Sequence, residues 1–179
     1  MTLYRQSEKN IGKTWLLWLL WSLFFGVVIG VGCGGDAKFP RYVNTEHGIQ
    51  IDYPSSWTPA DQGRLGVLLK PASASSPVVH LLIEPLPAGV TNLDELIKHS
   101  LPSLQQRHPQ SDFDPVDITT LSGEEGREIR WKSKFNIKTR AVMTIKNGRV
   151  YQVIFSGQEK PYDEWLPSVE KMISSFRIL

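Results

Sequence analysis

The residues best suited to contact a charged partner are clustered in one stretch of this 179-residue chain. Eight basic residues lie between positions 127 and 149 against a single acidic one, Glu128. Side chains alternate along a strand, so six of the eight can share one face or rim of a sheet. We call these six the basic strand face: Arg130, Lys132, Lys134, Lys138, Arg140 and Lys146. Clustered cations either dock on anionic lipid head groups or an acidic partner, or form a solvated strand face that nearby carboxylates neutralise. Both interpretations stay open.

The other residues able to do chemistry form no catalytic set. The histidines are His47, His80, His99 and His108, and no two of them have the spacing of a helical metal pair. Asp112, Asp114 and Asp117 resemble part of a calcium loop, but the glycine and the glutamate that an EF-hand requires are missing. No nucleophile elbow, phosphate-binding loop or zinc-protease motif occurs. We therefore expect no enzyme activity, no metal site and no cofactor, with a zinc site assembled across the fold from histidines and carboxylates as the alternative.

The single cysteine, Cys33, follows a segment typical of a secretory leader. Residues 1–14 are polar with a positive excess, and residues 15–31 are uncharged. A cysteine directly after this segment is the pattern of a bacterial lipoprotein, in which the leader is cleaved and the thiol is diacylated. The alternative is a retained signal anchor, because 17 uncharged residues lie at the short limit of a membrane span. Both alternatives place the rest of the chain outside the cytoplasmic membrane.

Composition excludes several classes of protein. The net charge of +2 arises from the first 32 residues, and residues 33–179 contain 17 basic and 17 acidic side chains. A neutral domain gives no reason to expect a nucleic-acid partner. One cysteine allows neither an intrachain disulfide nor a cysteine-based zinc site. A hydrophobic content of 41% is enough for one domain with a core.

Hydrophobic periodicity predicts strands, a helix, further strands and a final helix. We expect strands at 42–44, 49–53, 65–69, 78–84, 112–121, 127–135, 137–145 and 150–155, and helices at 92–101 and 161–174. Asn92 and Glu95 have the spacing of a capping box, and Pro102 is expected to kink or end the first helix. Asn147-Gly148 predicts a tight hairpin. In the last strand Tyr151, Val153 and Phe155 face one way and Val150 and Ile154 the other, so a helix is expected to cover the second face. This order predicts an α+β fold with a mainly antiparallel sheet.

Three sequence motifs are distinctive: Gly48-Ile49-x-Ile51-x-Tyr53-Pro54-x-x-Trp57, Asn147-Gly148-Arg149-Val150-Tyr151-x-Val153, and residues 172–178. Together they resemble the PsbP-like superfamily, which comprises the extrinsic photosystem II proteins and their bacterial relatives. The resemblance covers residues 42–179. It implies an α/β/α sandwich around a central antiparallel sheet and a non-catalytic accessory role at a membrane complex. Cyanobacterial members are lipoproteins, which agrees with Cys33.

The sequence thus predicts three parts: a leader or signal anchor at 1–32, a lipidated Cys33 with a short tether at 33–41, and a PsbP-like domain at 42–179. We expect the domain to be anchored to a membrane on its periplasmic or lumenal side. There it would serve a membrane protein complex as an accessory or assembly factor, of the photosystem II type in a photosynthetic host. The alternative is a periplasmic module that binds a small apolar or anionic ligand in a pocket between sheet and helix.

Overall fold

The computed structural model describes residues 38–63, 66–72, 74 and 76–179. The predicted leader, Cys33 and residues 34–37 of the tether lie outside these ranges. Residues Ala37–Leu179 make up one compact unit.

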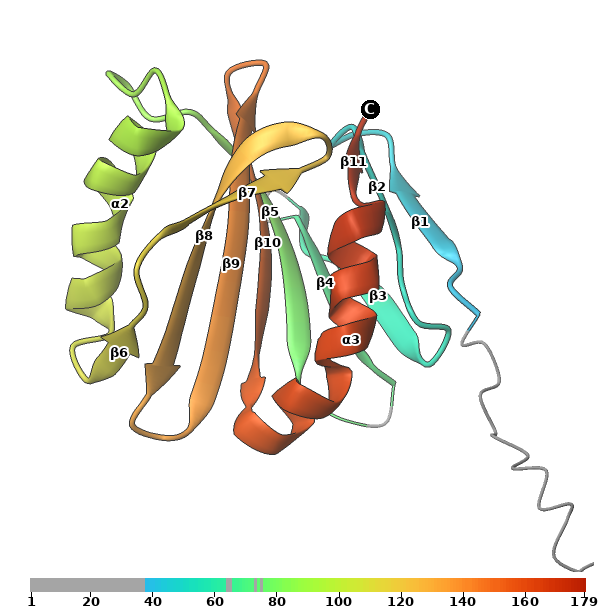
Figure 1. Ribbon diagram of the computed structural model, residues 1–179. Helices are drawn as coiled ribbons and strands as arrows, with labels where there is room; N and C mark the ends of the chain where they lie inside the picture. Colours follow the sequence, from blue (N-terminus) through green and yellow to red (C-terminus); the bar gives the residue numbers. More distant parts are fainter. Residues whose placement is uncertain (1–37, 64–65, 73, 75) are drawn as a thin grey trace, which may run out of the picture. The chain divides into compact units, whose positions relative to one another are not determined.

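A large antiparallel sheet forms the centre of this unit (Figure 1). Its strands are β3 (Trp57–Asp61), β4 (Val67–Pro71), β5 (Val78–Pro85), β6 (Ser111–Phe113), β7 (Asp117–Leu121), β8 (Glu124–Ser133), β9 (Ile137–Lys146) and β10 (Arg149–Gln158). They are ordered β3-β4-β5-β10-β9-β8-β6, and β7 also pairs with β8. The strand at 78–84 was predicted and lies between β4 and β10, near the middle of the sheet.

A small antiparallel sheet joins the two ends of the domain. It contains β1 (Arg41–Asn44), β2 (Ile49–Asp52) and β11 (Arg177–Ile178), in the order β1-β2-β11. The hairpin predicted around Gly48 is confirmed as β1 and β2. Pairing of the last strand with β2 therefore closes the domain.

Two helices, α2 (Leu93–Arg107) and α3 (Glu159–Ser175), cover opposite faces of the large sheet (Figure 1). One core lies between the sheet, α3 and the small sheet, and contains Val153 and Phe155. The other core lies under α2 and contains Val150, with Ile154 packed against it. The predicted α+β sandwich is confirmed, and so is the expected helical cover on the second face of β10.

The tight turn between β9 and β10 follows directly from its sequence. Asn147 and Gly148 have φ angles of 51° and 69°, as a two-residue hairpin turn of this type requires. The turn sets the register in which Lys146 faces Arg149. This register places the two faces of β10 in separate cores.

The start of α2 also follows the sequence, but its end does not. The Asn92 side chain accepts a hydrogen bond from the Glu95 amide at 2.9 Å, while the Glu95 carboxylate accepts from the Thr91 amide, one residue before the position in a standard capping box. Of the two predicted effects of Pro102, a kink or an end of the helix, the end does not occur, because α2 continues to Arg107. Pro102 lacks the amide hydrogen that would bond to the Lys98 carbonyl in a regular helix. Because Pro102 and Lys98 are both exposed, this carbonyl lies on the solvent side of the helix.

Three strand predictions need correction. Trp57 begins a further strand, β3, whose Pro59 is tolerated at the edge of the sheet. The strand predicted at 112–121 is two strands, β6 and β7, which pair with successive parts of β8. Pro115 lies between them and lacks the amide hydrogen that a continuous ladder needs. Phe135 lies outside β8, in the turn before β9, and its side chain does not face the core.

Candidate functional site

The basic strand face lies on the side of the sheet that α3 covers. Arg130 faces Arg140 across β8 and β9, and Lys132 faces Lys138. Like charges directly opposite each other destabilise a sheet. The arrangement therefore requires carboxylates nearby.

Carboxylates pair with five of the six cations. From α3, Glu159 contacts Lys132 at 3.0 Å and Lys138 at 3.2 Å. The further ion pairs are Lys138 with Asp163 at 2.9 Å, Arg140 with Glu170 and with Glu128 at 2.8 Å, Lys146 with Glu124 at 2.9 Å, and Arg130 with Asp114, Asp117 and Glu128. Hydrogen bonds from Lys132 and Lys138 hold the pKa of Glu159 below its usual value. Most of the positive charge on this face is therefore neutralised within the molecule.

Arg140 and Glu128 form the most deeply buried of these pairs. Their side chains are 13% and 6% exposed. Burial opposes the charge of Arg140, but the hydrogen bonds to Glu128 and Glu170 outweigh it and keep the pKa of Arg140 above its usual value. The Nε atom of Arg140 is buried without a hydrogen-bond partner in the described part of the chain. The Arg140–Glu128 pair therefore links β9 to β8, and the separate pair of Arg140 with Glu170 links the sheet to α3.

Lys134, the sixth cation, lies outside β8 in the turn between β8 and β9. Among the described residues, no carboxylate lies within ion-pair distance of Lys134. Its Nζ atom lies 5.0 Å from the centre of the Phe135 ring, and Phe135 is 67% exposed. We call Lys134 and Phe135 the β8–β9 tip. The sequence analysis included Phe135 in the predicted strand at 127–135 and so missed an exposed aromatic residue in the turn, beside a cation.

Hydrogen bonds from backbone amides hold this tip in place. The Ser133 hydroxyl accepts from the amides of Phe135 and Ile137, each at 3.3 Å. Asn136 adopts a positive φ of 57°, and its carbonyl accepts from the Glu159 amide at 2.9 Å. The tip is thereby fixed to the first turn of α3.

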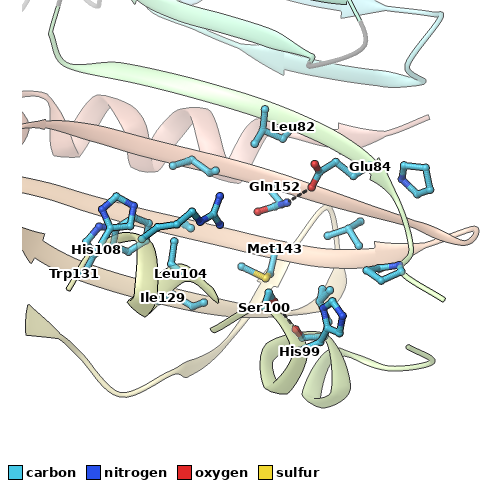
Figure 2. Close-up of a pocket in the computed structure, with 17 residues that line it drawn as sticks. Leu82, Glu84, His99, Ser100, Leu104, His108, Ile129, Trp131, Met143 and Gln152 are labelled. Carbon is cyan, nitrogen blue, oxygen red and sulfur yellow. Dashed lines mark hydrogen bonds between the residues drawn. The ribbon is translucent and has the colours of Figure 1, made fainter. Parts of the chain in front are cut away.

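A second candidate site is a pocket of about 400 Å³ between α2 and the large sheet. Figure 2 shows Leu82, Gln152, Met143 and Ile129 on four neighbouring strands, opposite Ser100 and Leu104 of α2. Other lining residues are Glu84, Pro85, Pro87, Leu96, His99, Arg107, His108, Trp131, Ala141, Val150 and Ile154. Gln152 donates a hydrogen bond to the Glu84 carboxylate at 3.0 Å. A pocket of this size, mostly apolar with a few polar groups, suits a small ligand.

The histidines do not form a metal site in the described part of the chain. His99 and His108 line the pocket, His47 contacts the Gly63 carbonyl, and His80 lies on β5 between Leu68 and Ile154. Within residues 38–63, 66–72, 74 and 76–179, no three histidine, cysteine or acidic residues are grouped to hold a metal. Asp114 and Asp117 contact Arg130 instead of forming a calcium loop. None of the helices in these same ranges has the length and apolar character needed to span a bilayer.

Comparison with known proteins defines the class of fold. No protein-family model matches this sequence, and no curated protein matches it significantly. Among solved structures, the cyanobacterial PsbP protein (CyanoP) of Synechocystis sp. PCC 6803 is similar with a TM-score of 0.63 and 17% identity, over 87% of this chain and 99% of that one. LpqN of Mycobacterium tuberculosis, described as involved in cell envelope biogenesis, is similar with a TM-score of 0.55 and 12% identity, over 80% of this chain and 86% of that one. The chain therefore has a PsbP-like α+β fold.

Proposed function

We propose that this protein is a lipid-anchored, non-catalytic domain that serves a membrane protein complex as an accessory or assembly factor on the extracytoplasmic side. The observation that carries the proposal is the short connection between the anchor and the domain. The first strand, β1, begins at Arg41, eight residues after Cys33. Eight residue steps extend to at most about 30 Å. A diacylated Cys33 would therefore keep the whole domain within reach of proteins in the same membrane.

We assign the docking contact to the β8–β9 tip. The other five cations of the basic strand face already have carboxylate partners, so contact with a new partner would first have to break ion pairs. Phe135 is a large exposed aromatic residue, and Lys134 beside it is a cation without a carboxylate partner among the described residues. Aromatic anchors contribute strongly to protein interfaces. The complementary surface is an apolar hollow with acidic residues at its rim, on photosystem II if the host is photosynthetic.

The docking assignment is tested by crosslinking in native membranes followed by isolation of the tagged protein. The test variant combines Lys134→Glu with Phe135→Ser, and the control is Lys98→Glu, which changes an exposed lysine on α2. We expect one membrane complex to be recovered with the wild type and the control, and at least tenfold less with the test variant. Equal recovery with all three would refute docking through the tip. Recovery of no membrane protein with the wild type would refute the accessory role.

The anchor is tested separately by metabolic labelling with an alkyne-bearing fatty acid. We expect label on the wild-type protein and none on a Cys33→Ala variant. An unlabelled wild type that stays in the membrane fraction would instead indicate a retained signal anchor.

A second function, a small-ligand-binding module, is supported by the pocket under α2. Its volume of about 400 Å³ lies in the range of small-molecule sites. Native mass spectrometry of protein isolated from its own host tests this candidate. We expect a discrete mass adduct that disappears on unfolding, and a bare chain in every preparation would contradict it.

A further inference from the structure

The pocket under α2 has the proportions of a long groove. At one end Trp131 pairs with Thr139 of β9, and at the other end Val150 pairs with Ile145 of the same strand. These two positions on β9 are six residues apart, which is about 20 Å along a strand. An extended alkyl chain fits along a groove of this length, and the volume of about 400 Å³ lies in the range of small-molecule sites.

The interior of the groove is apolar on both sides. Met143 and Ile129 form part of its floor on β9 and β8, and both are buried. Leu96 and Leu104 face them from α2. Leu96 is the buried residue of α2 among those described, and Leu104 is only partly covered. The helix therefore leaves part of its apolar side, and part of the sheet below it, open to a ligand.

One end of the groove carries a guanidinium group. Arg107 and His108 line this end and are both exposed, and the His108 ring lies 5.7 Å from the ring of Trp131. Among the described residues Arg107 forms no ion pair, and its one hydrogen bond is a long contact of 3.4 Å to the Ser103 carbonyl. A carboxylate or a phosphate is the natural partner of such a group.

Two other charges bear on an anion in this groove. The carbonyls at the end of α2 oppose an anion, but the His108 amide caps two of them, those of Leu104 and Gln105. Glu84 faces Val150 across β5 and β10, toward the other end of the groove. Its carboxylate repels an anion there, so a ligand with one charged end would bind in a single direction.

We propose that the groove binds a single-chain anionic amphiphile, either a long-chain carboxylate or an alkyl phosphate. The charged head contacts Arg107 and His108 at the exposed end, and the alkyl chain lies over Ile129 and Met143. This inference rests on the second candidate function and gives its ligand class. It is independent of the β8–β9 tip, which lies outside the groove lining.

Photolabelling of the full-length protein tests the proposal. The probe is dodecanoate with a diazirine near the end of its chain, added to protein in non-ionic detergent. After irradiation, mass spectrometry locates the label on peptides. We expect label on peptides of α2, β8 and β9 that line the groove. Label confined to residues 15–31, or spread over many surface peptides, would overturn the proposal.

Competition between the photoprobe and unlabelled amphiphiles tests which head group the groove prefers. Unlabelled dodecanoate and dodecyl phosphate are compared with dodecanol, which has the same chain without charge. We expect at least one of the two anions to compete ten times better than dodecanol, and the stronger of them identifies the carboxylate or the phosphate as the natural head group. Equal competition by all three would overturn the anionic class.

A charge reversal on α2 tests the role of Arg107. We expect Arg107→Glu to reduce specific labelling about tenfold, since a charge-assisted hydrogen bond is replaced by repulsion. Lys98→Glu makes the same charge reversal at an exposed site of α2 outside the groove lining, and we expect it to leave labelling unchanged. An equal loss in both variants would overturn the assignment. The accessory role is tested separately, by crosslinking with the variants of the β8–β9 tip. Failure of the photolabelling would therefore not affect the accessory role, and failure of the crosslinking would not affect the ligand proposal.

Discussion

Replacement of Arg140 by methionine probes the buried ion pair between β9 and Glu128 of β8, whose arginine also pairs with Glu170 of α3. Methionine keeps much of the length of arginine but removes the charge that neutralises Glu128. The Glu128 side chain is 6% exposed, so its carboxylate cannot be solvated in place of the lost partner. The variant therefore leaves a buried charge with one remaining contact, Arg130 at 3.1 Å.

The expected cost follows from this geometry. Removal of one partner of a buried ion pair typically costs about 3–5 kcal/mol. Arg130 is half exposed and still neutralises part of the Glu128 charge. We therefore expect the free energy of unfolding to fall by about 3 kcal/mol at pH 7. For a domain of this size the melting temperature should fall by about 6–12 °C.

Urea unfolding of a double-mutant cycle provides the measurement. We expect Arg140→Met combined with Glu128→Leu to lie within about 1 kcal/mol of the wild type, because both charges are then absent. Lys146→Met breaks a more exposed pair with Glu124 and should cost less than about 1 kcal/mol. If Arg140→Met costs no more than Lys146→Met, or if the double variant is the least stable of all, the assignment of a buried, mutually dependent pair is refuted.

Three further changes have defined outcomes. Burial holds the pKa of His80 below its usual value, so the unfolded chain takes up the proton first as the pH falls. The free energy of unfolding should therefore decrease as the pH drops through about 6.5. His80→Gln should remove this dependence on pH, measured by urea unfolding between pH 7 and 5. An unchanged dependence would exclude His80 as its source. Gly148→Ala places a side chain at a φ of 69° and should destabilise by about 1–2 kcal/mol, whereas no loss on thermal unfolding would mean that the turn changes type. Asn92→Ala removes the cap on the Glu95 amide and should cost about 1 kcal/mol, while Asn92→Asp should retain most of that stability.

Local sequence patterns were sufficient for much of the fold. The turn at Asn147-Gly148 and the cap at Asn92 depend on residues next to each other, and both were predicted. The alternation in β10 also predicted a covered second face. β3 and the separation of β6 from β7 were missed, because Pro59 and Pro115 act through the position of each segment at a sheet edge, which local sequence does not reveal.

The candidate site was harder to predict from the sequence than the fold. The cations of β8 and β9 were identified, but the partners that α3 supplies to three of them lie 21 to 30 positions away in the chain. One signal could have located them: Glu159, Asp163 and Glu170 are spaced by four and seven residues, which places them on one side of a helix. An acidic stripe on a helix that packs against a basic strand predicts neutralisation. The groove under α2 was expected only as a pocket between sheet and helix, since the roles of Arg107 and His108 depend on where α2 ends.

The central claim, that this anchored domain docks on a membrane complex, is tested most directly by a photocrosslinking amino acid placed at position 135 of the full-length protein in its own membranes. Val43 is also exposed but lies on β1, so the same substitution there is the matched control. We predict one discrete crosslinked membrane protein from position 135 and none from position 43. Crosslinks only to lipid from position 135, or the same products from both positions, would contradict the account.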